Sequence, residues 1–247
     1  MNIRAYIQRW RPSLRKIPGY RIALFFYQLV EGADSRNSAL LQLRQPKGLF
    51  QPYRTTSNDR YPEIFKFVRE QIGDGTDLRI LSVGCSTGEE VFSLRGYFSQ
   101  ATIVGLDINP LNIAACRSKL RKSGDARIHF SVAGSSQDQP DASYDAIFAM
   151  AVFRHGKLSH PPVPPRCDDR IRFSDFETSV ADLARTLKPG GLLVIHHAMF
   201  RFEDTLVAAG FRTTLRADND EDTPVYDRDN CLMDAVDSFG VVFQKIG

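Results

Sequence analysis

The run Leu81-Ser-Val-Gly-Cys-Ser-Thr-Gly-Glu-Glu90 constrains the fold of this chain more than any other feature. It joins a short apolar segment, typical of a buried strand, to two glycines and an acidic pair. Gly84 allows a sharp turn because it has no Cβ atom, and Gly88 allows a ligand to lie against the backbone where a helix begins. The run therefore predicts a strand, a tight turn and a helix, with a ligand site at the turn.

Short apolar segments alternate with helical ones along the rest of the chain, which predicts βαβ units. The expected fold class is α/β: a doubly wound, mostly parallel seven-stranded sheet with an N-terminal helical extension. We expect the extension to span residues 1–58 and the main domain residues 59–247. Right-handed crossovers place every strand-to-helix turn at one edge of the sheet, where ligands bind. The predicted strands are 78–83, 102–106, 127–132, 144–150, 191–196, 212–217 and 240–245, and the predicted helices after residue 60 are 61–72, 89–98, 112–120, 176–187 and 203–209.

Acidic residues follow both the glycine turn and the second predicted strand. Asp107 stands about 20 residues beyond the turn, the spacing at which a carboxylate accepts hydrogen bonds from ribose hydroxyls. The alternative is that Asp107 caps the helix that begins near Pro110. Glu89 and Glu90 would repel a phosphate and suit a cationic group such as an ammonium. The alternative for this pair is that it only complements the helix dipole.

A nicotinamide-binding Rossmann domain is the main rival, because it uses the same turn and the same acid. Its fingerprint is G-x-G-x-x-G, and residues 84–89 lack the middle and last glycines. One nucleotide-binding half is evident, without a substrate domain behind it. The sequence therefore favours a different cofactor.

The run Gly-Cys-Ser-Thr-Gly-Glu-Glu resembles the S-adenosylmethionine motif of the chemotaxis-receptor (CheR-type) methyltransferases, which modify protein glutamates. Residues 56–65 and 103–109 are similar to two further segments of that family, and Leu187-Lys-Pro-Gly-Gly-Leu-Leu193 is similar to a turn of most class I methyltransferases. The resemblance covers roughly residues 55–200. It implies a Rossmann-like class I methyltransferase fold, S-adenosylmethionine as cofactor and S-adenosylhomocysteine as product.

The resemblance also implies cofactor contacts. Gly84 and Cys85 would lie against the methionine part, Glu90 would hold its ammonium and Asp107 would bind the ribose, while residues 133–135 would border the adenine. The full set of implied cofactor-binding residues is Arg60, Gly84, Cys85, Ser86, Gly88, Glu90, Asp107, Ile108, Gly134, Ser135 and Ala149.

Two residues are candidates for a catalytic role. Arg60 would pair with the methionine carboxylate or orient the acceptor. After the fourth predicted strand the chain reads Ala149-Met-Ala-Val-Phe-Arg-His155, so that Ala151 and His155 replace an asparagine and a tyrosine of the CheR-type family. His155 with an ordinary pKa can take a proton from an acceptor. The alternative is a hydrogen-bonded loop histidine. The inserted β-subdomain with which that family docks receptors is not evident.

Other sequence features argue against a metal site, disulfide bonds, a membrane span and a signal peptide. His196 and His197 end the fifth predicted strand but show no metal-ligand spacing with His160 or Cys167, so we expect no metal site. The four cysteines are scattered without a C-x-x-C pair, which favours free thiols and a cytoplasmic location. We find no apolar run of membrane-spanning length and no signal peptide.

Charge is unevenly distributed. Residues 1–60 hold eleven Lys/Arg and three Asp/Glu, beside an aromatic helix predicted at residues 20–27. We expect this N-terminal arm to cover the methyl-transfer site as a lid; the alternative is a nucleic-acid-binding arm, which we consider the weaker hypothesis. The proline-rich run 159–166 is expected to form part of a lid or pocket wall, and the acidic stretches 218–222 and 227–237 a solvated loop.

Three functions remain open at this point. The first is an enzyme that methylates oxygen or nitrogen of a small molecule. The second is CheR-like methylation of a carboxylate on a protein or peptide. The third is a regulatory protein that binds S-adenosylmethionine without turnover.

Overall fold

The computed structural model describes residues 49–51, 57–219, 223–234 and 236–247. The predicted N-terminal helices and lid lie outside these residues, so the division at residue 58 stays a prediction. The described residues belong to one compact unit, Pro46–Gly247.

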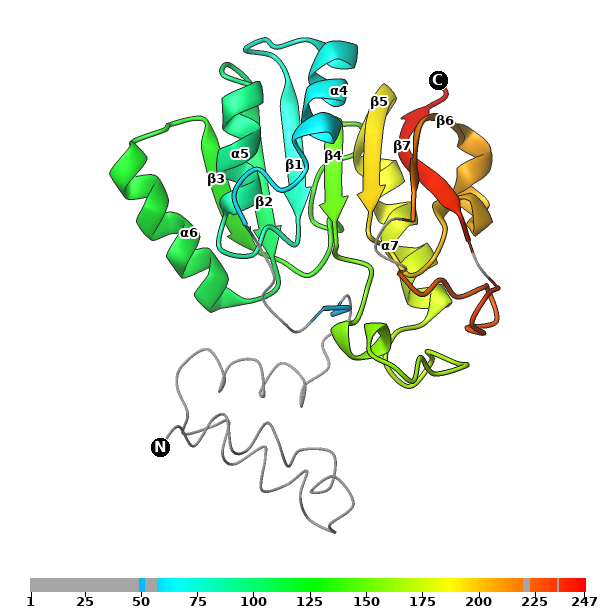
Figure 1. Cartoon of the computed structure of the whole chain (residues 1–247). Coiled ribbons are helices and arrows are strands. Elements are labelled where there is room, and N and C mark those ends of the chain that lie inside the picture. Colours follow the sequence, from blue (N-terminus) through cyan, green and yellow to red (C-terminus); the bar gives the residue numbers. More distant parts are fainter. Residues whose placement is uncertain (1–48, 52–56, 220–222, 235) are drawn as a thin grey trace, which may run out of the picture. The chain divides into compact units, whose positions relative to one another are not determined.

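The centre of this unit is a seven-stranded sheet with the order β3-β2-β1-β4-β5-β7-β6 (Figure 1). Strands β1 to β5 are parallel, whereas β7 pairs antiparallel with both β5 and β6. The prediction of a mostly parallel seven-stranded sheet is therefore confirmed, with an antiparallel edge. The strands are β1 (Arg79–Val83), β2 (Thr102–Asp107), β3 (Ile128–Val132), β4 (Tyr144–Met150), β5 (Leu187–His196), β6 (Phe211–Asp218) and β7 (Ser238–Lys245).

Helices cover both faces of the sheet. Consecutive strand residues such as Ile80 and Leu81 point to opposite faces and belong to separate apolar clusters. The cluster with Ile80 contains buried residues of α4 (Pro62–Ile72), α5 (Glu89–Tyr97) and α6 (Pro110–Ser123), and the cluster with Leu81 contains those of α7 (Phe173–Thr186). The sheet is thus doubly wound. Among the described residues, none of the helices is long and apolar enough to cross a membrane.

The helix predicted at residues 203–209 is wrong. The chain forms two short 3₁₀ helices there, η2 (Phe202–Asp204) and η3 (Leu206–Gly210). Thr205 separates them because it is extended, with φ −86° and ψ 155°. Its buried hydroxyl donates to the carbonyl of Phe202 at 2.7 Å, a local bond that competes with a continuous helix.

The segment from residue 187 to residue 191 was predicted as a turn before the fifth strand, and it forms the first part of β5. The ammonium of Lys188 contacts both carboxylate oxygens of Asp145 on β4, each at 2.8 Å. A Cβ atom on Gly191 would lie 3.0 Å from the carbonyl oxygen of Asp145, so a side chain there would crowd the neighbouring strand. These contacts lie at the amino ends of β4 and β5, away from the predicted ligand edge.

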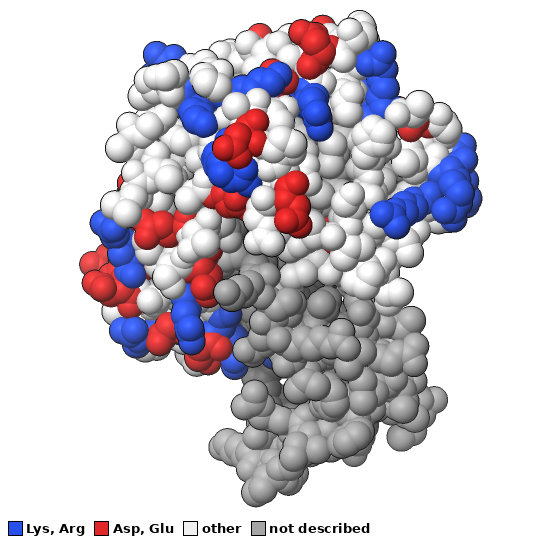
Figure 2. All heavy atoms as spheres, turned by 180° about the vertical axis from the view of Figure 1, so that it is seen from behind, with Lys and Arg blue, Asp and Glu red and all other residues white. Residues whose placement is uncertain are grey.

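Acidic and basic side chains are interspersed over most of the described surface seen in Figure 2. Ion pairs among the described residues include Arg95 with Asp125 at 2.7 Å and Arg201 with Asp204 at 2.5 Å. This face of the described residues therefore carries mixed charge rather than a broad basic surface suited to nucleic acid.

Candidate functional site

The turn after β1 has the strained backbone that its glycines predict. Gly84 has φ +68°, Gly88 has φ +96° as the N-cap of α5, and Ser86 between them has φ 51°. A Cβ atom on Gly84 would lie 2.7 Å from Cγ2 of Val152, so this position has neither the backbone conformation nor the space for another residue. Gly84 is exposed at the carboxyl edge of the sheet.

Asp107 joins this turn to the end of β2. Its carboxylate accepts hydrogen bonds from the backbone N–H of Ser86 at 2.8 Å, from that of Asn109 at 2.8 Å and from the side-chain amide of Asn112 at 3.0 Å. The N-cap of α6 is Asn109, whose side chain accepts from the backbone N–H of Leu111. Asp107 is therefore not the helix cap, which was the alternative to a ligand-binding role.

Glu89 and Glu90 have different surroundings. The ammonium of Lys119 contacts Glu89 at 2.5 Å, and the Thr87 hydroxyl donates to it at 2.6 Å. Partial burial acts to raise the pKa of Glu89, but these two bonds outweigh it and keep the pKa below its ordinary value. Glu90 accepts from the buried Ser82 hydroxyl at 2.7 Å, and desolvation raises its pKa to about 7. Glu89 thus has a structural partner, whereas Glu90 is a carboxylate whose charge is poorly compensated.

Two side chains beneath the turn bear on whether a ligand fits there. The Ser86 hydroxyl is buried and has no hydrogen-bond partner among the described residues, which leaves a polar atom for a ligand to satisfy. The Cys85 thiol is buried, and a hydrogen bond with Cys116, together with burial, raises its pKa well above the ordinary value. Cys85 is therefore a neutral thiol that packs under the turn.

The remaining predicted cofactor residues follow neighbouring strands at the same edge. Ile108 follows β2 and is half-buried, as are Gly134 and Ser135 after β3. Ala133 donates its backbone N–H to the Asp107 carbonyl at 3.1 Å, which joins the loop after β3 to the end of β2. Ala149 is fully buried within β4. Parallel pairing of β1, β2 and β3 thus brings residues 84–90, 107–108 and 134–135 to one edge.

Arg60 lies with aromatic residues near the ends of β4 and β5. Its guanidinium stands 5.1 Å from the centre of the Tyr61 ring, and that ring lies 5.3 Å from His196 and 5.5 Å from His197. Burial, together with the charges of Arg60 and Arg154, lowers the pKa of His197 to about 4. Sequence reasoning identified Arg60 but missed Tyr61 and Arg154. The pair His196-His197 at the end of the fifth predicted strand was the sequence feature that could have indicated this group of residues.

The residues that directly follow β4 and β5 have unusual backbone dihedral angles, and a hydrogen bond joins the two strand ends. Ala151 and His197 have φ values of 56° and 51°, and Ala151 donates its N–H to the His196 carbonyl at 2.8 Å. Non-glycine residues in the left-handed region are strained and concentrate at functional sites. Both of these residues follow directly on strand ends at the edge that carries Asp107.

His155 is buried and caps the short helix η1 (Gly156–Ser159). Its Nδ1 accepts from the backbone N–H of Lys157 at 3.3 Å. Burial lowers the pKa of His155 to about 4, and the charges of Lys157 and Arg170 act in the same direction. His155 is therefore a neutral and weakly basic imidazole near pH 7, and its predicted role as a catalytic base stays a prediction.

Part of the acidic stretch 227–237 is held by local hydrogen bonds. Asp227 accepts from the backbone N–H groups of Asp229 and Cys231, at 2.9 and 2.8 Å. The proline-rich run packs on this segment, since the Pro165 carbonyl accepts from the Leu232 N–H at 2.8 Å. Within the described residues, His, Cys, Asp and Glu form no group of three or more that could hold a metal ion.

The sheet order, the glycine turn and the acid at the end of β2 define a Rossmann-like fold of the methyltransferase type. Residues 81–195 match a family described as "Methyltransferase domain". The match covers less than half of this chain, and it does not support the CheR-type group in particular.

Curated relatives match about half of this chain. A protein named O-methyltransferase cnsE of Penicillium expansum is 30% identical over 119 residues, which cover 47% of this chain and 36% of the relative. A fatty-acid O-methyltransferase of Mycolicibacterium smegmatis is 32% identical over 127 residues, covering 51% and 39%. A demethylmenaquinone methyltransferase of Thermus thermophilus is 29% identical over 118 residues, covering 47% and 46%. The matched region thus spans less than half the length of each of these relatives.

Proposed function

We propose that this protein is an S-adenosylmethionine-dependent methyltransferase that acts on oxygen or nitrogen of a small molecule and releases S-adenosylhomocysteine. The observation that carries the proposal is the Asp107 carboxylate, which is bonded to the Ser86 N–H within a methyltransferase domain. The names of the relatives, which include O-methyltransferases and a quinone-pathway enzyme, support a small acceptor. A cytoplasmic location remains part of the proposal.

The chain's own residues fit the proposed cofactor. Glu90 would hold the cationic ammonium, because a desolvated carboxylate gains most from an opposite charge. Asp107 would accept from the ribose, and residues 134–135 would border the adenine. The unpartnered Ser86 hydroxyl would bond to the ligand at the turn. Arg60 would neutralise the methionine carboxylate or orient the acceptor.

When bound, the sulfonium group of this cofactor supplies an activated methyl. The protein's task is then mainly to orient the acceptor and exclude water. Because the pKa values of His155 and His197 are both about 4, neither imidazole is an efficient base near pH 7. We therefore propose that the acceptor atom reaches the site already deprotonated, or passes its proton to solvent.

The matches do not support CheR-like methylation of a protein or peptide carboxylate. A cofactor-binding protein without turnover stays the alternative, and the same experiment separates it from the enzyme. The full-length protein is titrated with S-adenosylhomocysteine by calorimetry. It is then incubated with methyl-labelled S-adenosylmethionine and a panel of phenols, carboxylic acids and amines. We expect saturable binding and label transfer to at least one acceptor class. Binding without any transfer would favour the regulatory alternative, and absence of binding would contradict the proposal.

A further inference from the structure

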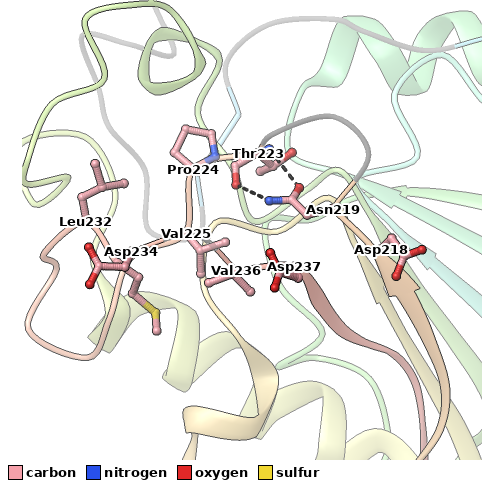
Figure 3. A pocket seen from close by; sticks show the side chains of 10 residues that line it. Asp218, Asn219, Thr223, Pro224, Val225, Leu232, Asp234, Val236 and Asp237 are labelled. Atoms are coloured by element: carbon pink, nitrogen blue, oxygen red, sulfur yellow. Dashed lines mark hydrogen bonds between the residues drawn. The ribbon is translucent and has the colours of Figure 1, made fainter.

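A pocket of about 420 Å³ lies between the end of β6 and the start of β7 (Figure 3). Because β5 and β6 both run antiparallel to β7, the carboxyl end of β6 lies at the same edge of the sheet as the turn after β1. The pocket volume is within the range of small-molecule sites. It is therefore at the correct edge, and of the correct size, to take part of an acceptor.

The polar side of the pocket is acidic. Asp218, Asp234 and Asp237 line it, and all three are exposed. Within the described part of the chain, none of these carboxylates forms an ion pair or a side-chain hydrogen bond. The described residues that line the pocket include no basic side chain. The lining thus carries a net negative charge and favours a cation.

The arrangement of the carboxylates favours an organic cation over a metal ion. Among the described residues, they belong to no group of three or more His, Cys, Asp or Glu side chains that could hold a metal ion. In Figure 3, Asp234 lies on the side of Leu232, and Asp218 lies on the opposite side beyond Asp237. Val225 and Met233 supply apolar lining. An ammonium on an apolar skeleton matches this combination better than a compact metal ion.

Thr223 gives an independent indication of a ligand. It lines the pocket and is only 3% exposed, yet its hydroxyl has no hydrogen-bond partner among the described residues. The backbone of Thr223 is held by Asn219, which accepts from its N–H at 2.9 Å and donates to its carbonyl at 3.1 Å. A buried hydroxyl without a partner is unfavourable, and an N–H donor of a ligand would satisfy it.

We propose that this pocket binds a protonated amine carried on a small apolar skeleton, and that this amine is the recognition group of the methyl acceptor. The carboxylates of Asp218 and Asp237 attract the ammonium by their charge, and the ammonium donates to the hydroxyl of Thr223. The apolar part packs on Val225 and Met233. The statement that this amine belongs to the methyl acceptor rests on the proposed function, whereas binding of the amine by the pocket does not.

The test compares phenethylamine with 2-phenylethanol, which has the same skeleton and no charge. Binding to the full-length protein saturated with S-adenosylhomocysteine is measured by calorimetry. We expect the amine to bind at least about tenfold more tightly, because only the amine carries a charge that the carboxylates attract. The double substitution Asp218→Asn/Asp237→Asn should remove that preference and leave alcohol binding unchanged. Thr223→Val should weaken the amine selectively. Asp229→Asn, an exposed acid of the same segment outside the pocket, is the matched control.

Equal binding of amine and alcohol, or unchanged amine binding in the double variant, would overturn the inference. So would displacement of the amine by micromolar Ca²⁺ or Mg²⁺, because the site would then be a metal site. The two proposals fail separately. Label transfer to a neutral acceptor, combined with unchanged amine binding in the double variant, removes this inference and leaves the methyltransferase in place. Charge-dependent amine binding without any label transfer supports the pocket and contradicts the proposed activity.

Discussion

At the residue scale, Asp107 has two roles that a substitution cannot separate completely. Its carboxylate holds the Ser86 N–H and the start of α6, and it is also the proposed ribose ligand. We expect Asp107→Ala to lower the free energy of unfolding by about 1.5–3 kcal/mol for each charge-assisted bond that is lost without replacement. Urea unfolding measures this change.

Asp107→Asn keeps one acceptor oxygen, so it should be more stable than Asp107→Ala. It should still bind S-adenosylhomocysteine at least about tenfold more weakly than the wild type. A folded Asn variant with unchanged affinity would contradict the ribose role.

Glu90 should make cofactor affinity depend on pH. Its pKa in the unliganded protein is about 7, and an ammonium partner would stabilise the ionised form. Affinity for S-adenosylhomocysteine should therefore fall by about tenfold from pH 8 to pH 6, as the carboxylate becomes protonated. Glu90→Gln should bind weakly at both pH values. Glu89→Gln is the matched control, since Lys119 and Thr87 already keep the pKa of Glu89 low. A wild-type affinity that does not change with pH would contradict the ammonium role.

The same pKa makes a prediction about stability. Because folding raises the pKa of Glu90 from 4.5 to about 7, the folded protein loses stability relative to the unfolded chain as pH rises from 4.5 to 7. Glu90→Gln removes this effect, so it should raise Tm above the wild-type value at pH 8. The two proteins should have nearly equal Tm values at pH 4. Thermal unfolding of the unliganded proteins measures the difference, and a lower Tm of the variant at pH 8 would show that burial of this carboxylate is not unfavourable.

At the scale of elements, the turn between β1 and α5 depends on glycine for two separable reasons. Gly84→Ala would place a residue with a Cβ atom at φ +68°, which costs about 1–2 kcal/mol, and would bring that Cβ within 2.7 Å of Val152. We expect a loss of stability larger than the backbone term alone, measured by urea unfolding. Val152→Ala, added to Gly84→Ala, should recover the steric part and leave the backbone part. The stability of the double variant is corrected for the effect of Val152→Ala alone. If it is then no higher than that of Gly84→Ala, the clash with Val152 does not contribute to the loss of stability.

At the scale of the whole molecule, the compact unit Pro46–Gly247 contains the complete seven-stranded sheet and both apolar clusters. We expect a protein lacking residues 1–45 to fold and to bind S-adenosylhomocysteine nearly as well as the full chain. Methyl transfer should be abolished if the N-terminal arm is the lid that its aromatic helix predicts. Circular dichroism, calorimetry and label transfer check the three statements in turn. Full turnover by the truncated protein would contradict the lid.

Local patterns were sufficient for the strands. The alternation of apolar and helical segments predicted each of the seven strands. The central strands are apolar along their length because they are buried on both faces, whereas β3 and β6 at the two edges are partly exposed. Glycines, strand ends and acids at defined spacings predicted the sites of Gly84, Glu90 and Asp107, since parallel strands bring their carboxyl ends to one edge. The sequence by itself thus determined the fold class and the position of the proposed cofactor site.

Tertiary contacts decided what each side chain does at that edge. Glu89 and Glu90 are adjacent residues of the same type. Lys119 and Thr87 pair with Glu89 and keep its pKa low, whereas desolvation raises the pKa of Glu90. His155 reads as an ordinary histidine until burial lowers its pKa to about 4. Asp218, Asp234 and Asp237 are exposed, as a solvated loop predicts, yet all three line one pocket between the end of β6 and the start of β7. In each case the deciding quantity is desolvation or a partner distant along the chain, and neither is encoded in local residue spacing.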